Sequence, residues 1–396
     1  MTPSRMHSRL LSATRGFSLI ELMVGIVISI ICTLGMMAAF SAYESQKRTT
    51  TNGSDAQQNG SFSTFMLERE IRTAGSALVQ GRNYGIWGCA IDAWSGGTKR
   101  LPLTAALAAP FDNWPLTTRA VPVLVAAGTG DKADVIGIVR GNPIARTFRT
   151  NMVSASGTTV TVDNTMAIFP GEYLLMSDKS GKCTFGLVST VNGTSIGLDT
   201  AGSASDGFSA PAHYTASLSA YIFDMGVNPA VTLFSVNQTN NSLVGYDLLQ
   251  RGAASGASIA PYPLADNVVQ LKTLYGLAAT PSDVTVDSWV KPTGTTWGIA
   301  ALTPTPDTQD ANNARSRIRA IRIAVVVRSR QQERAAPASA ASSDVAYIGY
   351  TGSTTLTLFG DLDATLQYSV TTDPTYRYKV YDLVIPVRNN LITKFF

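Results

Sequence analysis

Residues 17–40, near the start of the chain, are predominantly hydrophobic. Glu21 is the only charged residue among them. A helix rises about 1.5 Å per residue, so a run of this length can cross a bilayer core of roughly 30 Å. The pattern therefore predicts a transmembrane helix over 17–40, with one carboxylate near its start.

The pattern becomes amphipathic beyond this run. Residues 41–80 are expected to continue the helix as a stem, although 49–61 is poor helix material because it contains Gly53 and Gly60. Apolar residues then return at helical spacing and are expected to pack in a core: Phe62, Phe65, Met66 and Leu78. The charged residues among them are expected to face solvent: Glu68, Arg69, Glu70 and Arg72.

Short apolar or alternating runs follow in residues 81–396 and predict strands. They lie at 134–139, 158–162, 172–176, 184–191, 218–223, 268–276, 320–329 and 378–387. Asn192-Gly193 predicts a hairpin turn, whereas 277–316 is rich in Pro, Thr, Asp and Asn and predicts long loops. The predicted fold class is α+β, with a long N-terminal helix packed on one large antiparallel β-rich head.

The net charge of +4 changes this picture little, because most of it lies at the N-terminus. Of the 31 basic residues, three arginines lie in residues 1–16, which leaves 28 basic against 27 acidic residues in the rest. A nearly neutral remainder argues against a surface that binds nucleic acid by charge alone.

The basic start of the chain also sets the expected topology. Arg5, Arg9 and Arg15 precede the apolar run, so the N-terminus is expected to stay in the cytoplasm. A secretory signal peptide is the alternative, cut after the run at small residues such as those in "GMMAAFSA". A Gly-Phe junction stands before the run instead, and a cut there would keep the helix.

The stretch "RGFSLIELMVGIVISI" (15–30) resembles the type III signal of type IV pilins and type II secretion pseudopilins. The resemblance implies that prepilin peptidase removes residues 1–16 as a leader by cutting after Gly16. It also implies N-methylation of Phe17, the new first residue. The fifth mature residue of the family is a glutamate, which falls on Glu21.

A lone carboxylate in a membrane helix costs about 2.5 to 3.5 kcal/mol on insertion scales, so Glu21 needs a partner. The resemblance implies that it pairs with the α-amine of Phe17 in a neighbouring subunit and sets the axial register of a fibre. The alternative is an acid that reaches back to the cytoplasmic interface.

Blocks of the head resemble the PilW-type minor pilins in the same order along the chain. They are "FSTFMLEREIRTAGS…GIWGCA", "LLMSDKSGKCTFGLVSTV", "LADNVVQLKTLYGL", "RIRAIRIAVVVRS" and "YRYKVYDLVIPVRNN". Residues 92–130 and 277–316 match no block. The resemblance implies a structural subunit of a tip or priming complex that initiates type IV pilus assembly, supporting twitching motility, adhesion or DNA uptake.

The same resemblance implies where the chain acts and with what. Before assembly it would be a single-pass protein of the bacterial inner membrane with a periplasmic head, and afterwards part of the pilus tip at the cell surface. Expected partners are other minor pilins, the major pilin, prepilin peptidase and the assembly platform, with no cofactor and no small-molecule substrate. Two alternatives stay open: a J-type pseudopilin of type II secretion, and a head that acts as an adhesion or DNA-binding module.

The chain has three cysteines with different expected roles. Cys32 lies in the membrane helix, where it behaves as a small apolar residue. Cys89 and Cys183 lie in the head, which the expected topology places in the periplasm, where disulfides persist. A disulfide between them is expected, and two unpaired buried thiols are the alternative.

Catalytic and metal-binding motifs are poorly represented, so no enzyme is expected. The only histidines are His7 and His213, and the sequence holds no C-x-x-C or Walker A motif. Oxygen ligands cluster in "PDTQDANN" (306–313) without EF-hand spacing, and a solvated turn is the simpler interpretation. Asp361 and Asp363 fit an exposed turn.

Arginines surround one predicted strand. They are Arg315, Arg317, Arg319, Arg322, Arg328 and Arg330. They favour a half-buried strand with arginines on its solvent face and at its ends, which discourages edge pairing. A basic strip that contacts DNA or an acidic partner is the alternative.

Overall fold

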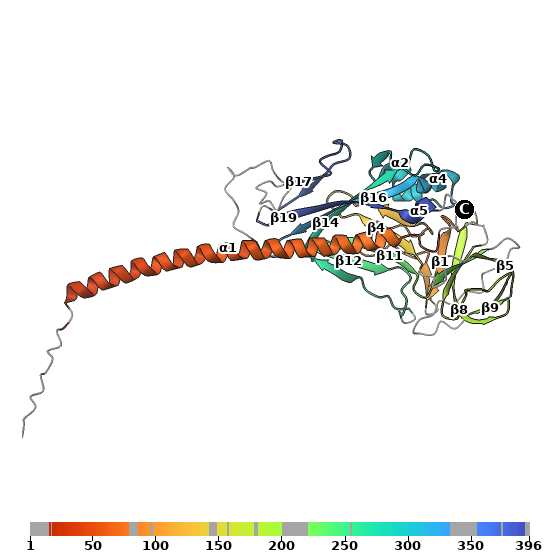
Figure 1. Ribbon diagram of the computed structural model, residues 1–396, viewed down its shortest axis with the longest axis horizontal. Helices are drawn as coiled ribbons and strands as arrows, with labels where there is room; N and C mark the ends of the chain where they lie inside the picture. Colours follow the sequence, from red (N-terminus) through yellow and green to blue (C-terminus); the bar gives the residue numbers. More distant parts are fainter. Residues whose placement is uncertain are drawn as a thin grey trace, which may run out of the picture. The chain divides into compact units, whose positions relative to one another are not determined.

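One long helix and several β-sheets make up the computed structural model (Figure 1). The structure describes residue 16 and residues 18–78, 86–95, 98–141, 149–156, 158–177, 181–199, 221–253, 256–332, 355–373 and 375–392. Residues 1–15 and Phe17 of the expected leader and cleavage site lie outside this part. The chain divides into two units, residues 1–51 and 52–396, and helix α1 (Leu19–Thr73) contributes to both.

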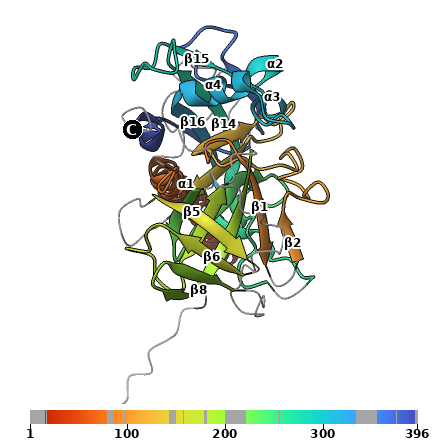
Figure 2. The ribbon, with the colours of Figure 1, turned by 90° about the vertical axis from the view of Figure 1, so that its right-hand side faces the viewer.

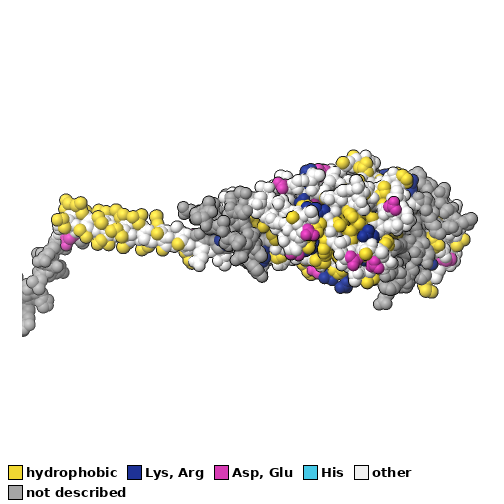
Figure 3. Space-filling model, turned by 90° about the horizontal axis from the view of Figure 1, so that it is seen from above, with side chains coloured by type: hydrophobic (Ala, Val, Ile, Leu, Met, Phe, Trp, Pro, Cys, Tyr) yellow, Lys and Arg dark blue, Asp and Glu magenta, His cyan; other side chains and the backbone are white. Residues whose placement is uncertain are grey.

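The first unit contains the beginning of α1. Side chains of residues 18–43 are exposed, and Figure 3 shows this stretch covered with hydrophobic side chains. By length and composition the helix can span a membrane, with a mean hydropathy of 2.4 over its most apolar window.

Residues 49–61 do not interrupt α1, despite two glycines. In the head, the ring of Tyr381 packs on the bare backbone of Gly60, and its hydroxyl donates to the carbonyl oxygen of Gln57 at 3.1 Å. A glycine is poor in an isolated helix, but here its missing side chain admits an aromatic ring. Tertiary packing therefore stabilises the section that helix propensity disfavours.

The buried face of α1 differs from the predicted one. Leu67 and Ile71 are fully buried, whereas Phe62 is 47% exposed and Phe65 is 59% exposed. The assignment of these two phenylalanines to the core is therefore wrong. The helical spacing is correct, but the face that contacts the sheets passes through Ser63, Leu67 and Ile71.

Glu70 was expected to face solvent and is instead buried. It forms an ion pair with Arg140 of the head at 3.1 Å and accepts a hydrogen bond from the neighbouring Arg69 at 3.1 Å. Asn389 adds a second link by donating to the carbonyl oxygen of Ala74 at 2.7 Å, just after the helix ends. Polar contacts therefore fix the last turns of α1 against strands far away in sequence.

Two antiparallel sheets enclose the main hydrophobic core of the head. The five-stranded sheet has the order β13-β12-β11-β4-β3, with bounds Tyr262–Asp266, Ser242–Asp247, Ala230–Asn237, Val135–Arg140 and Val123–Ala126. The four-stranded sheet has the order β15-β14-β16-β19, with bounds Ser288–Val290, Val268–Leu277, Ile318–Arg328 and Tyr378–Pro386. Figure 1 shows the head segment of α1 running between them.

A closed six-stranded barrel forms the other part of the head. Its strands are β5 (Arg149–Ser156), β6 (Thr159–Val162), β7 (Tyr173–Ser177), β8 (Lys182–Asn192), β9 (Ser195–Leu198) and β10 (Tyr221–Gly226). The order β8-β7-β10-β5-β6-β9 closes through the β8–β9 pair, and a separate apolar cluster fills the inside. The barrel faces the viewer in Figure 2. Strands β1 (Ala90–Ser95) and β2 (Thr98–Leu101) extend it from β8.

Strand β16 is buried on both faces. Its odd-numbered residues from Ile321 to Val327 join the main core, while Ala324 and Val326 pack in a third cluster. The hairpin of β17 (Thr355–Leu358) and β18 (Tyr368–Thr371) covers this second face. The prediction of a half-buried strand is therefore wrong, because a sequence pattern cannot show that a distant hairpin covers the other side.

Most predicted strands are confirmed within two residues of their expected bounds. Residues 218–220 of one prediction lie outside the described part. Asn192 pairs with Ser195 across a tight turn that has Gly193 at φ +60°, so the predicted hairpin is confirmed.

The prediction of long loops at 277–316 is wrong. This stretch contains β15 and the short helices α2 (Gly294–Trp297), α3 (Ile299–Leu302) and α4 (Gln309–Arg317). The side chain of Thr308 caps α4 by accepting from Ala311 N–H at 3.2 Å. Thr308 is a suitable cap residue, but the Pro and Asn residues around it favoured the prediction of a loop over that of a helix. The chain ends, within the described part, with α5 (Arg388–Ile392).

Candidate functional site

The first turn of α1 places the Glu21 carboxylate beside the backbone at the start of the helix. Ser18 N–H donates to Glu21 Oε2 at 3.0 Å, and Leu22 N–H donates to the carbonyl oxygen of Ser18 at 3.1 Å. A glutamate that reaches back to the N-cap amide is one half of a capping box, for which "SLIE" has the required spacing. The acid also lies at the positive end of the helix dipole.

Sequence reasoning gave Glu21 a role between subunits and missed this local one. The Ser-x-x-Glu spacing was the available signal. Gly16 is exposed, so the junction at which a peptidase would cut is accessible on the Gly16 side.

The helix face that continues from Glu21 carries small residues at four-residue spacing. A shallow groove along α1 is lined by Glu21, Leu22, Gly25, Ile26, Ser29, Ile30 and Thr33. Ser29 donates to the carbonyl oxygen of Gly25 at 2.7 Å, and Thr33 donates to that of Ile30 at 2.9 Å. The hydroxyls are thus satisfied within the helix, and small residues on one face let another helix approach closely in an apolar medium.

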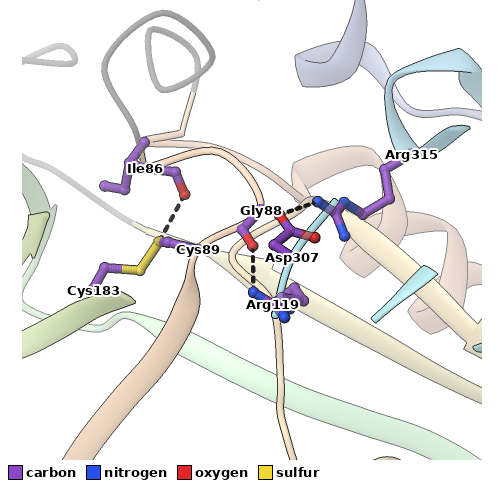
Figure 4. The surroundings of a disulfide bond; sticks show 7 residues. All are labelled: Ile86, Gly88, Cys89, Arg119, Cys183, Asp307 and Arg315. Atoms are coloured by element: carbon purple, nitrogen blue, oxygen red, sulfur yellow. Dashed lines mark hydrogen bonds and ion pairs between the residues drawn. A yellow bond between two sulfur atoms is a disulfide. The ribbon is translucent and has the colours of Figure 1, made fainter. Parts of the chain in front are cut away.

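In the head, a disulfide joins Cys89 to Cys183, so the expected pairing is confirmed (Figure 4). The two Cα atoms lie 5.8 Å apart across a sequence separation of 94. Both cysteines are buried, and the bond lies where β1 pairs with β8 of the barrel. It therefore ties the barrel to the segment that follows α1.

Two arginines hold the backbone beside this disulfide. Arg119 donates to the carbonyl oxygen of Gly88 at 3.2 Å and to that of Pro304. Arg315 lies against Gly88, donates to the carbonyl oxygen of Leu302 at 2.6 Å and pairs with Asp307 at 2.7 Å. Figure 4 shows both guanidinium groups pointing toward the Gly88–Cys89 corner.

Two of the arginines around β16, Arg315 and Arg319, are buried and do not lie on the expected solvent face, whereas Arg330 is exposed. Arg319 is 2% exposed and donates to the carbonyl oxygens of Pro281 and Asp283 at 2.7 Å each. Arg317 donates to the carbonyl oxygen of Ala278 at 2.8 Å. Guanidinium groups carry five donors in a fixed plane, so they can satisfy the carbonyls of the 277–316 stretch from the core side.

Arg322 has a different role, since it pairs with two carboxylates. It lies 2.7 Å from Asp361 and 2.6 Å from Asp382. Hydrogen bonds from Arg322 lower the pKa of Asp361. The carboxylate that was expected in a free turn thus fastens the β17–β18 hairpin to the four-stranded sheet.

A buried ion pair, which sequence reasoning missed, fixes the loop before β4. Lys272 Nζ lies 3.5 Å from Asp134 Oδ1 and donates to the carbonyl oxygen of Lys132 at 2.6 Å. Asp134 also accepts from Thr273 N–H at 2.8 Å. The single lysine within the strand "VVQLKTLYG" was the signal. Among the described residues, no group of three or more His, Cys, Asp or Glu side chains can hold a metal ion.

Two family models match this chain. The model described as Type IV Pilus-assembly protein W matches residues 234–389, from β11 to the start of α5. The model described as Prokaryotic N-terminal methylation motif matches residues 11–37. No curated protein and no solved structure matches the chain.

The two matches cover some parts of the structure and leave others unmatched. The first match covers the whole four-stranded sheet, and the second covers the first turns of α1. The barrel, the disulfide and the head segment of α1 lie outside both. The chain thus matches the PilW family over residues 234–389 and carries a pilin-type N-terminal signal.

Proposed function

We propose that this protein is a minor pilin, a structural subunit of a tip or priming complex that initiates assembly of the type IV pilus. One observation carries the proposal. An exposed apolar helix that matches the N-terminal methylation motif places a single carboxylate, Glu21, in its first turn. A helix of this kind suits an environment of lipid or of other apolar helices.

Processing would complete the site. Prepilin peptidase cuts after Gly16 and frees a positive α-amine on Phe17, which is then methylated. The amine of a neighbouring subunit pairs with Glu21 as the helices pack. A carboxylate accepts several hydrogen bonds, so the bond from Ser18 N–H leaves capacity for this partner.

The location follows from the same helix. The chain waits in the inner membrane with its N-terminus in the cytoplasm and its head in the periplasm. It then joins other minor pilins, and the major pilin extends the fibre below them. The inner-membrane assembly platform drives this step, and the finished complex lies at the pilus tip, where it supports twitching motility, adhesion or DNA uptake.

Two substitutions separate the charge of Glu21 from its capping bond. Glu21→Gln keeps an acceptor for Ser18 N–H and removes the charge, because Gln also serves in capping boxes. Glu21→Ala removes both. We expect both variants to be processed to a Phe17 start in the membrane fraction and to be missing from sheared surface fibres, as measured by N-terminal peptide mass.

Glu44→Gln is the matched control, since Glu44 lies on the same helix outside the apolar run. It should enter fibres as the wild type does. Wild-type levels of Glu21→Gln in fibres would show that the cap, and not the charge, is required. Failure to find a methylated Phe17 start in the wild-type fibre would contradict processing itself.

A J-type pseudopilin of type II secretion is the second candidate, since the N-terminal signal does not separate the two systems. A deletion strain that loses pili and twitching supports the pilus, whereas a strain that loses secretion with pili intact identifies the pseudopilin. Salt-dependent binding of DNA by the full chain would instead favour a DNA-binding head.

A further inference from the structure

Two carboxylates lie at one end of the barrel interior. Glu172 directly precedes β7 and is fully buried, and Asp224 on β10 is 2% exposed. Asp224 pairs in register with Leu174, which lines the barrel core together with Ile222. Because side chains alternate along a strand, Glu172 and Asp224 are on the inward face, at diagonal positions of neighbouring strands.

Each carboxylate has one oxygen held by the local backbone. Glu172 Oε2 accepts from Phe169 N–H at 2.8 Å, and Asp224 Oδ1 accepts from Gly226 N–H at 2.7 Å. The register of β7 and β10 shifts between Asp224 and Gly226, and Gly226 has φ +73°, so a bulge turns the strand at this point. Both side chains are therefore fixed in orientation from their own turns.

The other two oxygens are buried without a partner in the described part of the chain. They are Glu172 Oε1 and Asp224 Oδ2. Arg149, the nearest arginine on β5, pairs in register with Phe223 and stacks on the ring of Tyr221, so it lies on the opposite face of β10. Asp163, which follows β6, is already bound by Thr150 and Asn151.

Such an arrangement is unfavourable while both groups are ionised. Burial raises the pKa of Asp224 to about 6, and the charge of Glu172 adds to this effect. Burial raises the pKa of Glu172 as well. The two carboxylate oxygens are buried, carry like charge and are held in place by their backbones. A positive ion between them would therefore stabilise the ionised pair.

We propose that Glu172 and Asp224 bind a divalent cation with a preference for oxygen ligands, of which Ca²⁺ is the representative, at this end of the barrel. Carboxylate oxygens are the ligands that Ca²⁺ prefers, and backbone carbonyls and water commonly complete its shell. The cation neutralises the buried charges and leaves the two bonds to Phe169 and Gly226 intact.

Glu172 also holds a surface loop. The bond from Phe169 N–H ties the Met166–Gly171 turn to the carboxylate, and this turn exposes Met166 by 71% and Phe169 by 50%. The proposed site therefore lies directly beside an apolar loop of the barrel surface.

The experiment uses the full chain in detergent, first treated with EDTA and then titrated with CaCl₂ at pH 7.5, with the melting temperature as readout. We expect the wild type to melt at a higher temperature as Ca²⁺ is added. Glu172→Gln and Asp224→Asn should abolish this response, and in EDTA both should melt at or above the wild-type temperature because a buried charge is gone. Asp363→Asn, at an exposed carboxylate outside the barrel, should respond as the wild type does.

Equilibrium dialysis of the wild-type chain against Ca²⁺ gives a second measurement that needs no variant. One ion bound per chain, lost in either barrel variant, supports the site. A melting temperature that is equal in Ca²⁺ and EDTA, together with no bound ion, overturns it. A response that survives in both variants also overturns it, because the ion would then bind elsewhere.

Discussion

Gly88 has no side chain at a position where one would meet a guanidinium group. Its φ is +76°, and a Cβ added to it would lie 2.5 Å from Arg315 Nη2. The residue thus combines a left-handed backbone with a close approach, directly before the disulfide cysteine. Only glycine satisfies both conditions without displacing the pair of Arg315 and Asp307.

Gly88→Ala should destabilise the head by about 2 to 4 kcal/mol, of which about 1 to 2 kcal/mol comes from the left-handed backbone. Gly130→Ala is the matched control, since Gly130 has φ +60° and nothing within 4 Å of an added Cβ. It should show the backbone cost alone. Urea unfolding of the full chain in detergent, followed by tryptophan fluorescence, measures both, and equal losses would rule out the clash.

Two glycines of α1 should respond to alanine substitution with opposite changes in stability. Gly53 has nothing within 4 Å of an added Cβ, so Gly53→Ala should stabilise the helix by about 0.5 to 1 kcal/mol. At Gly60 the added methyl would overlap the ring of Tyr381, so Gly60→Ala should destabilise the protein. Melting temperatures of the two variants measure this. A shift of the same sign in both would mean that Tyr381 does not rest on the helix.

The ion pairs of Arg322 should make the stability of the head depend on pH. Arg322→Lys should lose about 1 kcal/mol at pH 7, because lysine cannot form the paired bonds to Asp361 and Asp382 and both carboxylates are partly exposed. The lowered pKa of Asp361 means that this stabilisation is present above the unfolded-state pKa near 4 and is lost as the pH falls further. Unfolding of both proteins between pH 7 and 3 should show their difference shrink. A constant difference would contradict the role of Asp361.

At the scale of elements, the disulfide decides how firmly the barrel is attached. Replacing both Cys89 and Cys183 by serine should lower the free energy of unfolding by about 2 to 5 kcal/mol, since the bond closes a long loop. Cys32→Ser should leave head unfolding unchanged, because Cys32 is exposed on the apolar part of α1. Denaturant unfolding of the oxidised full chain measures the loss.

Hydrogen exchange on the variant with serine at both 89 and 183 would show which strands lose stability when the disulfide is removed. Amides of β1 and of barrel strand β8 should exchange faster, because the bond joins them directly. Amides of β14 and β16 should keep their protection. Uniform loss across the head would show that the barrel and the sheets unfold together.

The positions of the strands could be predicted from the sequence more reliably than the elements that pack on each face of them. Alternation of Ile321, Ile323 and Val325 indicated a strand with one inward face, and the structure agrees. The same pattern could not show that β17 and β18 cover the opposite face, since these strands follow after an intervening segment. The buried arginines were expected on the solvent face for a similar reason. The sequence does not show which backbone carbonyls an arginine will contact in the fold.

Helix faces were equally hard to predict. The spacing of Phe62 and Phe65 marks a helix, but the side that packs is set by partners in distant strands, such as Arg140 at Glu70. In the candidate site, the Ser18–Glu21 bond follows from a four-residue motif and could have been predicted. The Glu172 and Asp224 pair could not, because only the register of β7 against β10 brings the two acids together.

At the scale of the whole molecule, the head is built from parts with separate cores. The barrel holds its own apolar cluster, and the family match at 234–389 begins after the barrel ends. The match therefore covers the four-stranded sheet and part of the five-stranded sheet, and it does not extend to the barrel. The proposed cation site belongs to the barrel, so its presence or absence leaves the minor pilin proposal unaffected.

The barrel begins and ends beside one rung of the five-stranded sheet. Arg140 at the end of β4 and Ala230 at the start of β11 are direct partners in the ladder. The barrel strands, from β5 to β10, therefore lie in sequence between two strands that are neighbours in this ladder. A hairpin whose ends are already paired accepts an exchange of its tip without strain on the ladder below. An exchange of the barrel at this rung would keep the ladder, but it would also remove the β1–β8 pair and the Cys89–Cys183 disulfide.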